Sequence, residues 1–206
     1  MRVAILSESS ADEAALRILV DAVLGSPAIK VDPPLARKSG VSGVYSTLGA
    51  VIRSLHFRAS ADGLVVVVDS DYNSITGVKG RDCLNELREN ASAVLRTLKP
   101  IHANPPLRVA VGIAVPAIEA WLLCRDYSDV TEAAWENGLA ANKDPYTKLE
   151  LKQRLYGTDK PLTSQRMEKL LAAARRAAAD IRTIEQRFPS GFGLLAKELR
   201  DWMTTR

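Results

Sequence analysis

The chain has 206 residues, of which 47% are apolar and 25% charged, with 28 Lys and Arg against 24 Asp and Glu and a net charge of +4. This is ordinary globular usage, which excludes a disordered, collagen-like or coiled-coil chain, and the length allows one domain with at most a small appendage. The longest aliphatic run is far shorter than a membrane span and no signal-peptide pattern opens the chain, so we expect a cytoplasmic protein without a membrane partner.

Apolar periodicity predicts alternating strands and helices as far as residue 125. Ser10 and Glu13 fit a capping box at the start of the first helix, and Pro116 suits the first position of a later one. The predicted strands cover residues 2–6, 28–31, 64–68 and 107–115, and the predicted helices cover residues 10–24, 44–55, 81–98 and 116–124.

Beyond residue 125 the pattern predicts helices only, at 130–139, 145–155, 164–187 and 193–203. Alternating strands and helices are typical of a parallel sheet with helices on both faces. We therefore predict an α/β fold with a small, mostly parallel sheet of three to four strands in residues 1–125. Residues 126–206 are predicted to form a helical C-terminal extension packed on this core.

Acidic residues follow three of the predicted strands. Glu8 comes after the first strand, Asp69 and Asp71 after the strand of residues 64–68, and Glu119 after the last. In open parallel sheets, ligands bind beyond the carboxyl ends of the strands, so we expect these four acids to share one site. The i, i+2 spacing of Asp69 and Asp71 places both carboxylates on one side of an extended chain.

Clustered carboxylates repel one another unless a cation neutralises them or one stays protonated, and oxygen ligands suit Mg²⁺ or Mn²⁺. The two cysteines show no metal-ligand spacing, which excludes a thiolate zinc site, and the two histidines show none either, which disfavours a His-rich metal site. Alternatives remain for each acid. Asp69 and Asp71 could cap a turn, Glu8 could be a solvated loop residue, and Glu119 could serve the helix dipole. A haloacid-dehalogenase-type phosphatase, with Asp69 as nucleophile, is a weaker alternative because its acidic pair normally ends the first strand.

Basic residues near the predicted strand ends are candidates for binding phosphate. Arg37 and Lys38 precede a helix N-terminus, and Lys79 and Arg81 follow the acidic pair. A solvated loop is the alternative for all four. Residues 140–187 carry 11 Lys and Arg against 6 Asp and Glu, and we interpret these helical charges, Lys148 and Lys152 among them, as a solvent-facing surface.

The segments ILSESSADEAAL, with Glu8, and VVVVDSD, with Asp69 and Asp71, together resemble the Toprim domain of topoisomerases, primases and small ribonucleases. The closest resemblance is to a Toprim-like family of uncharacterised prokaryotic proteins. Its members share a small basic loop like Arg37-Lys38-Ser39-Gly40, a segment like VAVGIAVPAIEAWLL and a C-terminal pattern like FPSGFGLLAKELRDW.

This resemblance implies that Glu8, Asp69 and Asp71 bind Mg²⁺ and that Glu119 is a further active-site acid, either a metal ligand or a general base. It also implies a nuclease of DNA or RNA that accompanies an ABC-type ATPase in antiphage defence. Many Toprim proteins have Gly after the first acid, where this chain has Ser9. A catalytically weak or silent partner subunit of such an ATPase therefore stays open, as does a homo-oligomer.

Overall fold

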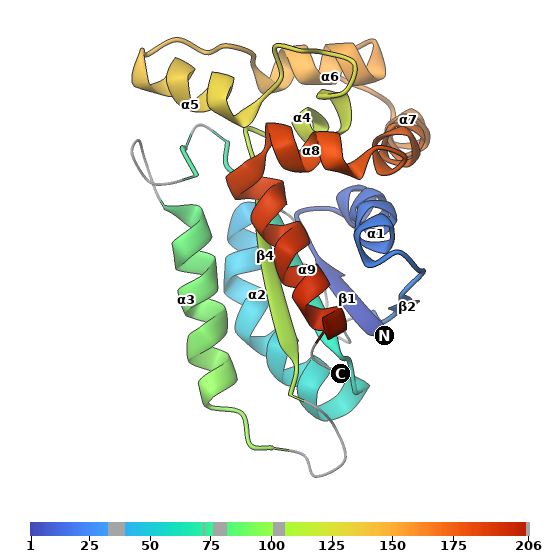
Figure 1. Cartoon of the computed structure of the whole chain (residues 1–206), viewed down its shortest axis with the longest axis vertical. Helices are drawn as coiled ribbons and strands as arrows, with labels where there is room; N and C mark the ends of the chain where they lie inside the picture. Colours follow the sequence, from blue (N-terminus) through green and yellow to red (C-terminus); the bar gives the residue numbers. More distant parts are fainter. Residues whose placement is uncertain (33–39, 72, 76–81, 101–105, 205–206) are drawn as a thin grey trace.

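One parallel sheet forms the centre of the protein. The structure, a computed structural model, describes residues 1–32, 40–71, 73–75, 82–100 and 106–204. Within these ranges, β1 (Arg2–Leu6), β2 (Ile29–Lys30), β3 (Gly63–Asp69) and β4 (Arg108–Ala114) pair in the order β2-β1-β3-β4, all parallel (Figure 1). The aliphatic β3 lies between β1 and β4, as expected for a strand that is covered on both faces. The predicted α/β class is confirmed.

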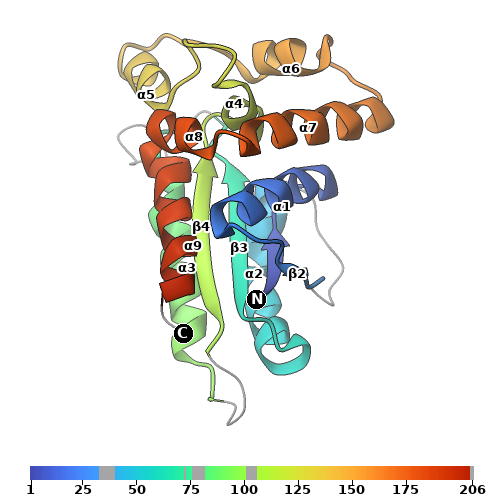
Figure 2. The ribbon, with the colours of Figure 1, turned by 45° about the vertical axis from the view of Figure 1, so that its right-hand side comes forward.

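Amphipathic helices cover both faces of this sheet. Helices α1 (Ser10–Leu24) and α9 (Leu194–Thr204) lie on one face, and α2 (Val41–Ser54) and α3 (Cys83–Arg96) lie on the other (Figures 1 and 2). Apolar side chains of both layers pack on the strands in one continuous core. In the described part of the chain, no helix has the length and apolarity needed to cross a bilayer.

The remaining helices gather beyond the carboxyl ends of the strands, and we call this group, α4–α8, the helical cap (Figure 2). Because α9 then returns along the sheet beside α1, the C-terminal part of the chain contacts both the end and one face of the sheet. The boundary at residues 125 and 126 stays a prediction. The cap consists of α4 (Ile118–Leu123), α5 (Glu132–Ala140), α6 (Lys148–Tyr156), α7 (Thr163–Ala178) and α8 (Ile181–Arg187).

Three features of the helices show where the prediction was wrong in kind rather than by a few residues. The N-cap of α1 is Ser9 rather than Ser10, because the Ser9 side chain accepts the backbone N–H of Asp12 at 3.2 Å. Pro116 lies outside α4, which begins at Ile118 after a cis Val115–Pro116 peptide. The Ala-rich segment predicted as one helix is divided at Asp180 into α7 and α8.

Two glycines allow the C-terminal segment to pack closely on the sheet. A Cβ atom on Gly191 would lie 2.3 Å from the carbonyl oxygen of Ile113, and one on Gly63 would lie 2.4 Å from the Trp202 ring. The turn around Gly191 is also held by Glu132, whose carboxylate accepts the N–H groups of Ser190 and Gly191 at 3.0 and 2.8 Å. The FPSGFG segment thus approaches β4 closely with its backbone, and the RDW segment approaches β3 closely with the Trp202 ring.

The outer edge of β4 is partly occupied by a side chain. Glu198 of α9 accepts the N–H of Val111 through Oε2 at 3.1 Å, and its Oε1 accepts from Arg88 of α3 at 2.5 Å. These bonds connect the edge strand to a helix on each face of the sheet.

Candidate functional site

Acids from three strand ends line one cavity between the sheet and the helical cap. Glu8 follows β1, Asp69 is the last residue of β3, and Glu119 lies in the first turn of α4 after β4. The fold brings them together because parallel strands end at the same edge of a sheet. The cavity has a volume of about 310 Å³. Its lining residues are Glu8, Ser9, Asp12, Gly40, Asp69, Ala117, Glu119, Lys148, Lys152 and Arg166.

Backbone hydrogen bonds fix the orientation of two of these acids. The N–H of Asp69 donates to Glu8 Oε1 at 2.7 Å, and the N–H of Ile118 donates to Asp69 Oδ1 at 3.0 Å. Each bond joins one strand end to the segment that follows its neighbour in the sheet. The first turn of α4 and the two carboxylates are therefore held in register with one another.

Asp71 is placed differently from the expectation of an extended chain. Its φ of 55° is in the left-handed region, and its N–H donates to the carbonyl oxygen of Pro116 at 3.1 Å. The chain therefore turns directly after Asp69. The half-exposed Asp71 side chain is joined to that of Asp69 by a shared partner, Lys148.

Lys148, the first residue of α6, lies between these two acids. Its ammonium group donates to Asp69 Oδ2 at 3.0 Å and also to Asp71 Oδ1. Burial opposes the charged form of the lysine, but the two carboxylates outweigh it and raise the pKa of Lys148. In the described structure, a cation from the chain itself thus neutralises the acidic pair.

Glu119 is buried and has a partner from the other end of α6. Only 2% of this residue is exposed, and its Oε1 accepts the hydroxyl of Tyr156 at 3.0 Å. Burial, followed by the proximity of Glu119, raises the pKa of Tyr156, so its hydroxyl keeps the proton that it donates. Helix α6 therefore holds Asp69 and Asp71 through its first residue and Glu119 through its last.

Arg166 of α7 adds positive charge to the same cavity. It donates to Asp12 of α1 at 3.2 Å and thereby joins the cap to the first helix. Burial would lower its pKa, but Asp12, Tyr156 and Glu119 outweigh that effect and raise it. The guanidinium stays charged beside the carboxylates.

The pKa values of two acids in the cavity, Asp69 and Glu8, are raised. Burial, with added repulsion from Glu8 and Glu119, raises the pKa of Asp69 to about 8 despite the proximity of Lys148. Burial also raises the pKa of Glu8, although the N–H of Asp69 and the charge of Lys148 oppose the shift. These carboxylates are therefore costly to keep ionised together, as is typical of a site built for a cation or a proton.

The four basic residues predicted to bind phosphate, Arg37, Lys38, Lys79 and Arg81, lie outside the described residues. The described lining of the cavity instead takes its positive charge from Lys148, Lys152 and Arg166. The interpretation of Lys148 as a solvent-facing charge is wrong, since 23% of its side chain is exposed and it forms ion pairs with two acids. A weak signal exists in the sequence, because a lysine in the first turn of a helix opposes the helix dipole.

The cap also holds the chain that follows Asp71. Trp135 of α5 donates its indole N–H to the carbonyl oxygen of Asn73 at 3.3 Å, and Glu136 accepts the N–H of Ile75 at 2.9 Å. Both bonds join positions about sixty residues apart in the sequence. Helices α5 and α6 thus both hold the segment that contains the acidic pair.

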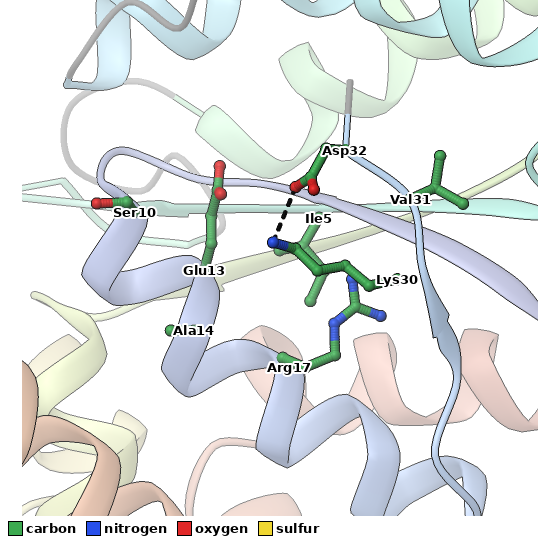
Figure 3. A pocket seen from close by; sticks show the side chains of 8 residues that line it. All are labelled: Ile5, Ser10, Glu13, Ala14, Arg17, Lys30, Val31 and Asp32. Carbon is green, nitrogen blue, oxygen red and sulfur yellow. Dashed lines mark ion pairs between the residues drawn. The ribbon is translucent and has the colours of Figure 1, made fainter. Parts of the chain in front are cut away.

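A second cavity, of about 280 Å³, lies between α1 and the β2 edge of the sheet (Figure 3). Two of its lining residues, Lys30 and Asp32, form an ion pair of 3.0 Å, and Arg17 donates to the carbonyl oxygen of Val3 at 2.8 Å. Glu13 lines this cavity and not the one lined by Glu8, Asp69 and Glu119. This second cavity carries charges of both signs, but it does not bring together carboxylates from several strand ends as the first cavity does.

The donor set of the acid cavity fits Mg²⁺ or Mn²⁺ in type, because its carboxylate oxygens are the ligands that these ions prefer. Their present arrangement is organised around Lys148 instead. In the described ranges, no three Asp, Glu, His or Cys side chains are arranged to hold a metal ion. The ion and the metal-binding roles of Glu8, Asp69, Asp71 and Glu119 therefore stay predictions.

Comparison of the chain with known protein families, curated proteins and solved structures finds no match. The Toprim-like resemblance is thus carried by the quoted segments alone.

Proposed function

We propose that the protein is a Toprim-like, Mg²⁺-dependent nuclease that hydrolyses phosphodiester bonds in DNA or RNA. One observation carries this proposal: Glu8, Asp69 and Glu119, from three separate strand ends, line a single cavity together with Lys148, Lys152 and Arg166. Acids that can hold a cation, next to basic side chains that can bind phosphate, are the two features that metal-dependent phosphodiester hydrolysis uses.

Glu8, Asp69 and Asp71 would hold the ion, with Glu119 as a further ligand or as a general base. Mg²⁺ would supply a polarised phosphate oxygen and an activated water. Lys152 and Arg166 would bind the phosphate and orient the scissile bond. Tyr156 would keep the Glu119 carboxylate directed at the cavity, since it donates to one of its oxygens. We further propose that the protein acts in the cytoplasm in antiphage defence, with an ABC-type ATPase as partner.

The test is cleavage of DNA and RNA panels in the presence of Mg²⁺ or Mn²⁺. We expect metal-dependent cleavage by the wild type and its loss in Asp69→Ala. Asp62→Ala is the matched control, because Asp62 precedes β3 at the opposite end of the same strand and should leave cleavage intact. Robust metal-dependent cleavage by Asp69→Ala would contradict the role given to this residue.

One observation favours a second function, that of a catalytically silent subunit that binds an ABC-type ATPase. Lys148 already satisfies Asp69 and Asp71, so the acidic pair is neutralised without an ion. A wild type that is folded but neither binds Mn²⁺ nor cleaves any nucleic acid would favour this function over the nuclease.

A further inference from the structure

Lys148 is placed in a position that its own helix does not favour. Helix α6 begins at Lys148, directly after a capping box formed by Thr147 and Glu150. The N-terminal end of a helix carries a partial positive charge, so a lysine in the first turn is repelled by the helix. The acids outside α6 must therefore account for the position of this ammonium group.

The contacts of Lys148 are those expected of a bound cation. Its ammonium group bonds one oxygen of Asp69 and one of Asp71, with 23% of the lysine side chain exposed. The other oxygen of Asp69 accepts the N–H of Ile118, so the oxygen that faces Lys148 is the one left for an ion. A divalent ion and this ammonium group would compete for the same oxygen atoms.

We propose that Lys148 is an internal counter-ion that occupies the cation position of the Asp69–Asp71 pair and must be displaced when a divalent metal binds. This inference rests on the proposed function, since it assumes that these acids bind a metal. Lys148 belongs to the helix whose last residue, Tyr156, donates to Glu119. Binding of the metal and packing of α6 against the acids are therefore coupled, so the helical cap contributes to the affinity of the site for metal.

The test measures the affinity of the purified full chain for Mn²⁺, by calorimetry or from the electron paramagnetic resonance signal of free Mn²⁺. Lys148→Met removes the competing charge, and we expect it to bind Mn²⁺ at least about tenfold more tightly than the wild type, since a charge-assisted contact is lost only from the metal-free state. Lys148→Arg keeps the charge and should bind Mn²⁺ much as the wild type does. Lys152→Met is the matched control.

Lys152 lies one turn further along α6 and lines the same cavity, so its replacement removes the same charge without removing a contact of Asp69 or Asp71. A gain in Lys152→Met equal to that in Lys148→Met would overturn the proposal, because general electrostatics would then account for it. If circular dichroism shows that Lys148→Met does not fold, Lys148→Gln is used in its place, because this variant keeps a hydrogen-bond donor without the charge.

The outcomes separate this inference from the proposed function. If the wild type binds Mn²⁺ and Lys148→Met binds it no more tightly, the counter-ion role is overturned and the nuclease proposal stays intact. Absence of Mn²⁺ binding in the wild type and in every Lys148 variant overturns both. Binding by the variant alone supports the occupation of the cation position by Lys148, but it contradicts the nuclease proposal, because the wild type would then not take up the metal.

Discussion

The hydrogen bond from Tyr156 to Glu119 gives a quantitative test of how the cap holds the site. The variant Tyr156→Phe removes one oxygen atom and leaves the Glu119 carboxylate without the donor that lies 3.0 Å from its Oε1. Both residues are buried, with 3% of Tyr156 and 2% of Glu119 exposed, so water cannot easily replace the hydroxyl. A hydrogen bond to a charged group contributes about 1.5–3 kcal/mol, and we expect the free energy of unfolding to fall by about 2 kcal/mol.

Tyr146→Phe is the matched control for this change. Tyr146 is also fully buried, and its hydroxyl donates to the carbonyl oxygen of Thr131 at 2.8 Å. The same atom is deleted, but the acceptor is neutral, and such a bond contributes about 1 kcal/mol. The two variants therefore differ mainly in the groups around the deleted hydroxyl, which are the ionisable side chains of Glu119 and Arg166 for Tyr156 and a neutral carbonyl for Tyr146.

Urea denaturation followed by tryptophan fluorescence measures both variants against the wild type. A loss in Tyr156→Phe clearly larger than that in Tyr146→Phe would support a strong contact by which α6 holds Glu119. A loss equal to or smaller than the control would refute the reasoning, since the Tyr156 hydroxyl would then contribute no more than a bond to a neutral carbonyl.

Two further predictions concern the acids and the packing of the C-terminal segment. Because burial raises the pKa of Asp69 to about 8, folding favours its protonated form; stability from this group is present below the ordinary Asp pKa near 4 and is lost as the pH rises towards 8. Urea denaturation should therefore show that the free energy of unfolding falls less between pH 5 and pH 8 in Asp69→Asn than in the wild type. An equal fall in the two proteins would contradict the raised pKa of Asp69. Gly191→Ala should destabilise the protein by about 1–3 kcal/mol, because its Cβ would lie 2.3 Å from the carbonyl oxygen of Ile113. A melting temperature equal to that of the wild type would show that the turn can move away from β4.

The sequence allowed the sheet and the gathering of acids to be predicted for a simple reason. The run Leu64–Val68 is apolar at every position and mostly β-branched, which is typical of a strand covered on both faces, and parallel strands place their carboxyl ends together. Glu8 and Asp69 therefore met as expected, with the Asp69 N–H on the Glu8 carboxylate.

The role of Lys148 could not be predicted in the same way. It lies 79 residues from Asp69 in the sequence, and a lysine in a polar helix has the same local pattern whether it faces solvent or an ion pair. The division of residues 164–187 at Asp180 was missed for a related reason. The Ala-rich sequence favours helix throughout, and the direction of α8 depends on tertiary contacts that periodicity does not report.

The carboxylate of Glu198 on the edge of β4 has a consequence for assembly. An exposed edge strand offers free N–H groups to a strand of another molecule, which promotes dimers or aggregates. Here the N–H of Val111 already has an acceptor, and Arg88 holds that acceptor in place from the opposite face. A second chain could extend the sheet at this point only by first expelling a glutamate from its ion pair, so growth of the sheet past β4 is discouraged by charge.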